Sequence, residues 1–264
     1  MNVSLITSRL TGLPIPQIRY YDVIGSTNDE ALRWAAAGAA DGCLVVANQQ
    51  TSGRGRLGRR WVTTPGAALA FSLIMLPYPA EQAQSSFFTA LGALAVCQAL
   101  ETRLGLAVQI KWPNDILLEG KKTAGILVEA NWMGQEMQSV VIGIGVNIAA
   151  ESVPPASELL FPATSVEQNT RKKVDRIDLL RAILQGFVDW RVQLQKGGIR
   201  SAWEDRLAFK GDWVNIEETA SPAGSTPLTG QVMGLDDSGS LLLRSAAGAI
   251  VRVAVGDLHL RLIE

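Results

Sequence analysis

A glycine- and arginine-rich segment at residues 50–61 is the strongest constraint on how this chain folds. It reads Gln-Thr-Ser-Gly-Arg-Gly-Arg-Leu-Gly-Arg-Arg-Trp, with three glycines and four arginines in eight consecutive positions. Glycine disfavours helix and strand interiors and lets a ligand approach the backbone, while guanidinium groups bind carboxylate and phosphate oxygens through paired donors. We therefore expect a loop that suits an anionic ligand. From these residues alone, a solvated turn or a nucleic-acid-binding loop explains the segment equally well.

The composition describes an ordinary globular chain and narrows the function classes. Its 264 residues suit one main domain plus a small one, and 47% of them are hydrophobic against 19% charged. A formal net charge of −1 argues against a protein whose main task is to wrap duplex nucleic acid. The sequence shows no signal-peptide pattern and no apolar run of roughly 18–20 residues. We therefore expect a cytoplasmic protein with no membrane or nucleic-acid partner, in which Cys43 and Cys97 are buried apolar residues.

Hydrophobic periodicity and turn residues predict a mixture of helices and strands. Residues 1–18 contain Gly12, Pro14 and Pro16 and should form an extended lead-in. Strands are expected at residues 18–24, 43–47, 67–75, 108–112, 115–118, 121–129 and 140–148, helices at 26–38, 81–104, 177–194 and 201–209, and a loop at 150–170. After residue 210, short strands between Gly, Asp and Ser clusters predict a small β-barrel. The pattern indicates an α+β fold with domains at residues 1–210 and 211–264.

Several polar clusters accompany the Gly/Arg segment. Lys111-Trp112-Pro113-Asn114-Asp115 lies at an interrupted strand, Lys122 and Gly125 follow on its partner, and Gly143-Ile144-Gly145-Val146-Asn147 ends an apolar strand. Glycine inside a strand indicates a bulge or the close approach of another group. At the start of the helix at 26–38, Ser26 with Asp29 and Thr27 with Glu30 have the spacing of capping pairs. Each cluster alone fits a turn, a bulge or a cap, but together they suggest a site.

Four ordered motifs resemble those of the biotin protein ligases, also called biotin–[acetyl-CoA-carboxylase] ligases. They are residues 53–61, 111–115, 122–129 and 143–147, and the resemblance covers about residues 18–264. It implies a mixed-sheet catalytic domain of the biotin/lipoate ligase type followed by a small C-terminal SH3-like β-barrel. Family members that repress transcription carry an N-terminal helix-turn-helix domain. This chain lacks room for one and resembles the monofunctional class without that DNA-binding domain.

The resemblance implies a two-step reaction that uses ATP. Biotin and ATP form biotinyl-5′-AMP and pyrophosphate, with Mg²⁺ on the phosphates, and a lysine of a biotin carboxyl carrier protein then accepts the acyl group. Joining a carboxylate to a phosphate requires positioned positive charge, which the arginines, Lys111 and Lys122 can supply. Because the intermediate is a reactive anhydride, we expect the glycine-hinged loop to be mobile when empty and ordered over the ligand.

The resemblance also assigns roles to individual residues. Biotin would be bound by Ser26, Thr27, Asn28, Gln50, Arg54, Gly55, Arg56, Lys122 and Gly125, and the nucleotide by Trp61, Lys111, Asn114, Asn147 and Arg261. The catalytic set would be Lys111, Lys122, Arg54, Arg56 and Asp115. Asp115 either orients the incoming lysine amine or only caps a turn. Leu57 departs from members that have another basic residue there, which leaves less positive charge in the loop.

Alternatives from other classes remain open at this point. A lipoate or octanoate protein ligase or transferase of related fold also modifies a carrier lysine, although the Gly-Arg-Gly-Arg and Lys-Trp-Pro-Asn-Asp motifs favour biotin. A nucleic-acid-binding module could use the loop and Trp61, but the near-neutral net charge weighs against it. A third alternative is a protein that only binds ligand and has lost catalysis. The sequence does not exclude it, although every cation that matches the family motifs is present. In this family an exposed sheet edge can serve either a homodimer or the carrier.

Overall fold

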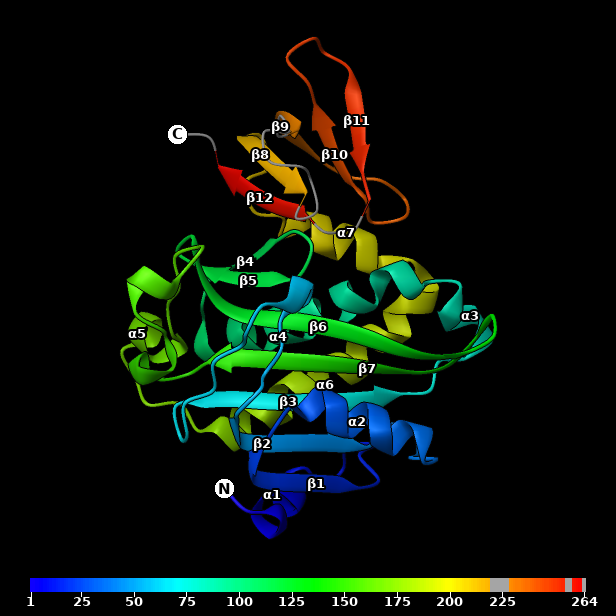
Figure 1. The fold of residues 1–264 in the computed structure, drawn as a ribbon, viewed down its shortest axis with the longest axis vertical. Coiled ribbons are helices and arrows are strands. Elements are labelled where there is room, and N and C mark those ends of the chain that lie inside the picture. The colour runs from blue at the N-terminus through cyan, green and yellow to red at the C-terminus, as the bar shows by residue number, and fades with distance from the viewer. Residues whose placement is uncertain (219–227, 255–257, 263–264) are drawn as a thin grey trace.

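The computed structural model describes residues 1–218, 228–254 and 258–262, and its main unit is a seven-stranded mixed sheet (Figure 1). The strand order is β1-β2-β3-β7-β6-β5-β4, with the first pair parallel and every other pair antiparallel. The strands are β1 (Ile18–Ile24), β2 (Leu44–Gln50), β3 (Ala68–Met75), β4 (Val108–Lys111), β5 (Asp115–Leu118), β6 (Lys121–Met133) and β7 (Glu136–Asn147). All seven expected strand regions are confirmed, and β6 and β7 extend beyond their predicted ends.

Helices cover the two faces of this sheet unequally. α4 (Phe88–Leu104) and α6 (Arg176–Lys196) pack together behind the sheet in Figure 1, whereas α2 (Thr27–Ala36) lies on the front face. Gly186 of α6 allows this close packing, because a Cβ there would lie 3.0 Å from the carbonyl oxygen of Ala95 in α4. The predicted end of α4 is also confirmed, since Gly105 closes it in the left-handed conformation.

Strand alternation decides which residues reach the front face. Side chains along a strand point alternately to the two faces, and the core with α4 and α6 takes Val140, Ile142, Ile144 and Val146 from β7. The residues between them, including Gly143 and Gly145, therefore face the side of α2. The loop between β2 and β3 crosses this face beside α2 (Figure 1). The front of the sheet beyond α2 is thus the place where the loop and the glycine-bearing strands meet.

Three local predictions are wrong. The lead-in contains a helix, α1 (Val3–Arg9), because the Asn2 side chain caps it by accepting a bond from the Leu5 N–H and Ile6 is fully buried. The helix expected at residues 81–104 is divided into α3 (Pro79–Gln82), η2 (Ser85–Phe87) and α4. The η2 turn brings the Phe87 ring 6.4 Å from that of Trp203, edge to face.

The third wrong prediction is the loop at residues 150–170. It contains η3 (Ala150–Ser152), η4 (Ala156–Glu158) and α5 (Val166–Thr170). A capping box starts α5, in which the Gln168 side chain accepts from the Ser165 N–H at 3.0 Å. The prolines that suggested a loop all precede this helix.

A second, five-stranded antiparallel sheet follows α7 (Gly198–Asp205). Its strands are β8 (Trp213–Glu218), β9 (Leu228–Leu235), β10 (Leu241–Arg244), β11 (Ile250–Val253) and β12 (Leu258–Leu262), in the order β11-β10-β9-β8-β12. A mixed sheet with helices followed by a small C-terminal β unit confirms the predicted fold class. Cys43 and Cys97 are both buried and free, as expected. Among the helices within the described ranges, none has the length and apolar character that a membrane span requires.

Candidate active site

A cavity on the front face of the sheet gathers most of the residues predicted to form a site. This inner chamber is lined by Ser26, Thr27, Asn28, Gln50, Arg54, Gly55, Arg56, Trp61, Lys111, Asn114, Asp115, Lys122 and Gly125, among others. A second cavity, the outer chamber, shares Trp61, Lys111, Asp115 and Lys122 with it and adds Asn147. The fold therefore brings together every predicted site residue whose side chain is described.

The start of α2 supplies the first wall of the inner chamber. Ser26 is the N-cap residue, and its hydroxyl accepts a hydrogen bond from the Asp29 N–H at 3.5 Å. Thr27 instead donates both its N–H and its hydroxyl to Gln50 Oε1, at 2.8 and 3.0 Å. The capping pair Ser26–Asp29 is thus confirmed and the pair Thr27–Glu30 is wrong, because Glu30 forms ion pairs with arginines outside the chamber.

Asn28 packs directly on β7. Its Oδ1 lies 2.6 Å from the Ser72 hydroxyl, and its Nδ2 donates to Glu129 Oε2 at 2.7 Å. A Cβ at Gly143 would lie 2.0 Å from Asn28 Oδ1, so a larger residue could not stand there without moving Asn28. Of the two meanings of a strand glycine, close approach is the correct one here. The pairing of β7 with β3 and β6 continues without a bulge through this position.

The Gly/Arg segment is folded as a small hairpin over the inner chamber. The Gly55 N–H donates to the Arg59 carbonyl at 2.7 Å, and the Trp61 N–H donates to the Gly53 carbonyl at 2.8 Å. Between these bonds lies the short turn η1 (Arg56–Gly58), with Leu57 in the left-handed region at φ +62°. The segment is therefore a defined loop, and its mobility in the absence of ligand stays a prediction.

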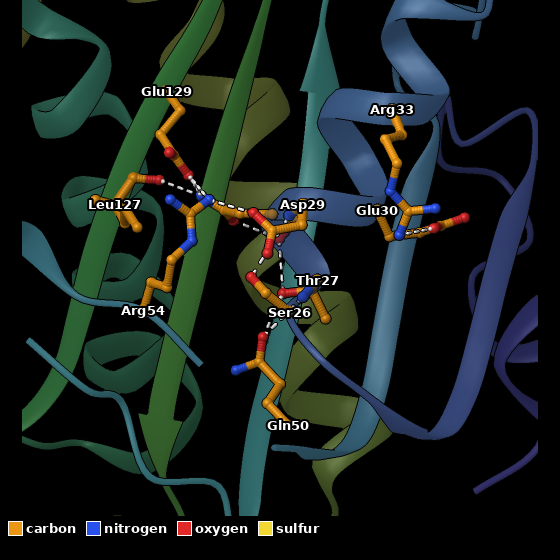
Figure 2. A network of polar contacts seen from close by, with 11 residues as sticks. Ser26, Thr27, Asp29, Glu30, Arg33, Gln50, Arg54, Leu127 and Glu129 are labelled. Atoms are coloured by element: carbon orange, nitrogen blue, oxygen red, sulfur yellow. Dashed lines mark hydrogen bonds and ion pairs between the residues drawn. The ribbon is translucent and has the colours of Figure 1, made fainter. Parts of the chain in front are cut away.

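Two arginines tie this hairpin to its surroundings. The Arg54 guanidinium bonds to Asp29 of α2 at 2.5 Å and to Glu129 of β6 at 2.9 Å (Figure 2). Arg56 Nη1 donates to Asn114 Oδ1 at 3.3 Å, in the turn between β4 and β5. Three elements that are far apart in the sequence thus hold one loop.

Trp61 stands at the border between the two chambers. Its indole lies against two glycines, since a Cβ at Gly145 would lie 2.3 Å from the ring and one at Gly125 would lie 3.3 Å away. The indole N–H is buried and has no hydrogen-bond partner among the described residues. Lys122 Nζ lies 5.6 Å from the ring centre. The position of the Trp61 ring explains why residues 125 and 145 are glycines. Stacking of Trp61 on adenine stays a prediction.

A buried cluster of charges occupies the junction of the chambers. Lys122 Nζ lies 2.6 Å from Asp115 Oδ1, and Lys111 Nζ lies 3.9 Å from Asp115 Oδ2. Burial alone would raise the pKa of Asp115, but the positive charges of Lys122 and Lys111 outweigh it and hold this pKa below its usual range. Asp115 is therefore an ionised carboxylate near neutral pH. The register of β5 with β6 places Asp115 opposite Gly125, which brings the cluster beside Trp61.

The outer chamber combines positive charge with an aromatic ring. Arg59, Arg60 and Lys111 line it, and Lys111 Nζ lies 4.5 Å from the centre of the Phe161 ring. Asn147 also lines this chamber, where its Nδ2 donates to the Thr164 carbonyl at 3.2 Å. Asn114, which the resemblance grouped with the nucleotide, lines the inner chamber instead.

Sequence reasoning missed one lining residue, Phe161, and three residues that bond to lining side chains. Ser72 and Glu129 bond to Asn28, Thr63 accepts a bond from Gln50, and Phe161 packs on Lys111. Glu129 could have been found, because strand alternation puts it on the same face as Gly125. Phe161 had no such signal, since its segment was expected to be an unstructured loop.

Two predictions concern groups that the structure shows only in part. Arg261 lies in β12 opposite Asn215 of β8, but its side chain is outside the described part of the chain. Over the ranges that are described, no group of three or more His, Cys, Asp or Glu residues could hold a metal ion.

Comparison with known proteins agrees with this geometry. The model of the biotin/lipoate A/B protein ligase family matches residues 20–147. The chain is 38% identical over 245 residues to a bifunctional ligase/repressor BirA of Bacillus spizizenii, covering 91% of this chain and 73% of that protein. It is 40% identical over 234 residues to a biotin–[acetyl-CoA-carboxylase] ligase of Paracoccus denitrificans, with 84% and 92% covered. The structure of a biotin protein ligase from Aquifex aeolicus in complex with biotin and ATP matches with a TM-score of 0.76 at 26% identity, covering 94% of this chain and 100% of that one.

Proposed function

This chain belongs to the biotin/lipoate A/B protein ligase family, and from that premise we propose that it is a biotin–[acetyl-CoA-carboxylase] ligase, an enzyme that uses ATP. In the first step a carboxylate oxygen of biotin attacks the α-phosphorus of ATP, and pyrophosphate leaves. In the second step the ε-amine of a lysine on a biotin carboxyl carrier protein attacks the acyl carbon. AMP leaves, and the amine loses a proton.

The observation that carries this proposal is that neutral polar side chains of the inner chamber and the cation-lined outer chamber meet at one charged cluster. The inner chamber offers neutral polar groups at Ser26, Thr27 and Asn28, which suit the carbonyl and N–H groups of a ureido ring. The outer chamber is lined by cations, which suit phosphates. A biotin molecule whose ureido ring lies at the start of α2 would direct its carboxylate to the junction, where Lys122 and Lys111 lie.

The two lysines are proposed to neutralise charge during adenylation. Two anions approach each other in this step, so fixed cations at the junction lower its barrier. Lys122 would contact first the biotin carboxylate and then the acyl phosphate. Arg56 and the backbone of Gly55 would cover the ligand from the loop, and Gln50 would hold Thr27 in place, as their 2.8 Å bond supports.

Asp115 is proposed to orient the amine of the carrier lysine rather than to deprotonate it. A carboxylate with a lowered pKa is a weak base but remains an anion near neutral pH. Lys122 Nζ lies 2.6 Å from Asp115 Oδ1. When the acyl phosphate engages Lys122, Asp115 becomes available to accept a hydrogen bond from the incoming amine.

Magnesium is proposed to arrive with ATP. Mg²⁺ keeps several water ligands and usually binds phosphate oxygens with one or two carboxylates, so it does not need a cage of protein groups. That chemistry fits the walls within the described ranges, where Asp115 is the acidic residue of the junction. The ion would offset phosphate charge, while Lys111, Lys122 and Arg56 position the reacting groups.

Three further proposals concern the domains, the cellular location and the edge of the sheet. We propose a catalytic domain at residues 1–210 and a separate SH3-like barrel domain at residues 211–264, supported by the separate five-stranded sheet. We also propose a cytoplasmic protein without a nucleic-acid partner, supported by the net charge of −1. β1 is an edge strand of the seven-stranded sheet, and we propose that this edge serves either a second copy or the carrier. Sedimentation of the protein with and without carrier domain separates these two uses.

A substrate-dependent exchange assay tests the function. Purified protein with biotin, ATP and Mg²⁺ should exchange labelled pyrophosphate into ATP only when biotin is present, and it should label a carrier domain on one lysine. The family also includes lipoate ligases. Exchange that depends on lipoate or octanoate rather than biotin would overturn the proposal.

A further inference from the structure

One carboxylate connects the inner wall of the site to the loop that covers it. Glu129 lies on the front face of β6, and its Oε2 accepts hydrogen bonds from Asn28 Nδ2 at 2.7 Å and from Arg54 Nη2 at 2.9 Å. Figure 2 shows the Arg54 guanidinium between Glu129 and Asp29. None of the roles assigned above uses Glu129. The same oxygen of Glu129 therefore contacts both Asn28, which is proposed to bind the ureido ring, and Arg54 of the loop.

The contact with Glu129 sets the orientation of the Asn28 side-chain amide. Asn28 Nδ2 has two acceptors on β6, namely Glu129 Oε2 at 2.7 Å and the Leu127 carbonyl at 3.3 Å. Its Oδ1 consequently turns toward the Ser72 hydroxyl, 2.6 Å away. Without the negative charge of Glu129, the two ends of the amide would be less distinct in energy. Glu129 thus fixes the polarity of a buried side chain that belongs to the inner wall.

For Arg54, the contact with Glu129 is one of two ion pairs, and we call the two pairs together the clasp. Its guanidinium is held at 2.9 Å by Glu129 of β6 and at 2.5 Å by Asp29 of α2. Arg54 also begins the hairpin, whose ends are joined by the bonds Gly55 to Arg59 and Trp61 to Gly53. Lifting the hairpin from the inner chamber would therefore break both ion pairs.

We propose that Glu129 is a positioning residue that couples occupancy of the inner chamber to closure of the loop. A ligand that binds Asn28 changes the position of the Glu129 carboxylate, which also binds Arg54. Closure of the loop in turn restricts the motion of the Asn28 side-chain amide. Loss of this link leaves the chemistry at Lys122 intact but shortens the time for which ligand is held. The inference rests on the proposed function, because it takes biotin as the ligand of the inner chamber.

The expected effect is moderate because the clasp is partly exposed to solvent. The side chains of Arg54, Asp29 and Glu129 are 40%, 49% and 25% exposed. Ion pairs with this exposure contribute little individually and are screened by salt. We expect Glu129→Gln to speed dissociation of biotin by about threefold to tenfold. The KM for biotin should rise by a similar factor, while kcat for pyrophosphate exchange changes by less than about twofold.

A double-mutant cycle on biotin dissociation tests the coupling. The wild type, Glu129→Gln, Arg54→Gln and the double variant are compared by displacement of labelled biotin at low and high salt. If the residues act through one another, the double variant dissociates no faster than the faster single variant, and the salt dependence seen in the wild type is reduced in all three. Asp178→Asn is the matched control, because it removes an exposed 2.6 Å ion pair with Arg9 away from both chambers.

The outcomes separate this inference from the proposed function. If the wild type binds no biotin, the proposed function fails. If the wild type binds biotin but Glu129→Gln dissociates at the wild-type rate, or if the two variants have independent multiplicative effects, the coupling is refuted. If Glu129→Gln does not fold, Asp29→Asn replaces it, since Asp29 holds the other side of Arg54. An unchanged dissociation rate and salt dependence in Asp29→Asn would then refute the clasp.

Discussion

Lys122 and Asp115 form a 2.6 Å ion pair across the hairpin of β5 and β6, at the junction of the two chambers. The pair is adjacent to Lys111, so two cations share one carboxylate. This arrangement holds positive charge beside a carboxylate, with the Lys122 and Asp115 side chains 26% and 11% exposed. When an anionic ligand enters, the same lysines can exchange one carboxylate for another. The pair therefore explains how a buried cluster of charges can remain stable and still be available for chemistry.

Replacing Lys122 should slow the first step strongly. Lys122→Met keeps most of the side-chain volume but removes the charge that is proposed to face the ligand carboxylate. Loss of one such group typically costs about 100-fold or more in rate. Pyrophosphate exchange at saturating biotin measures it, with Lys121→Met of the neighbouring exposed lysine as control. Equal activity of the two variants would contradict the assigned role.

Asp115→Asn should destabilise the protein in a pH-dependent way. The pKa of Asp115 is lowered in the folded state, so its ionisation stabilises the fold above the unfolded pKa of about 4. That stabilisation is lost as pH falls through the lowered folded pKa. We expect the variant to be less stable than the wild type by about 3 kcal/mol at neutral pH, with the difference shrinking below about pH 4. Urea denaturation at several pH values measures this, and a difference that grows on acidification would contradict the ionised state of Asp115.

Gly143→Ala should displace Asn28 and weaken biotin binding. The added Cβ would lie 2.0 Å from Asn28 Oδ1, and such overpacking costs about 1–3 kcal/mol. Calorimetric titration with biotin should show at least about tenfold weaker binding. Gly25→Ala is the control, because no atom lies within 4 Å of a Cβ there and its backbone is not in the left-handed region. Full binding by Gly143→Ala would mean that Asn28 does not contact the ligand.

Arg56→Ala should leave the fold intact but weaken retention of the adenylate. Arg56 ties the loop to Asn114 at 3.3 Å and adds positive charge above the inner chamber. Its loss should loosen the proposed cover and remove a positive charge that is proposed to face the acyl phosphate. Release of preformed biotinyl-5′-AMP, measured by chase with unlabelled biotin, should accelerate by about tenfold or more. Arg56→Lys should restore part of the retention, and wild-type release by Arg56→Ala would count against the loop as a cover.

The sequence predicted the site better than it predicted the connections around it. The chemistry of the glycines, lysines and amides in the motifs was enough to predict a site, and the fold brings these residues to one face. Helix α1 was missed because a single Asn2 cap and one buried residue, Ile6, outweigh the glycine and prolines that follow. The Phe161 wall was missed because it depends on backbone bonds between Lys122 and the residues Pro162 and Thr164, which are distant in the chain. No local pattern contains such long-range pairing.

The indole of Trp112 offers a final prediction, about how the small C-terminal sheet supports the site. Its buried N–H donates to the Gly239 carbonyl at 3.1 Å, which links the turn between β4 and β5 to the turn after β9. Trp112→Phe keeps an aromatic ring but leaves that carbonyl without its donor, which costs about 1–3 kcal/mol.

Trp203→Phe is the matched control for this variant. Trp203 is equally buried, it also packs on Gly239, and its indole N–H has no hydrogen-bond partner within the described ranges. Both substitutions remove the same atoms, so the difference between their free energies of unfolding isolates the hydrogen bond. Equal losses would mean that the bond contributes nothing. A larger loss in Trp112→Phe, together with a fall in the rate of pyrophosphate exchange, would show that the C-terminal sheet helps to hold the strand that carries Lys111.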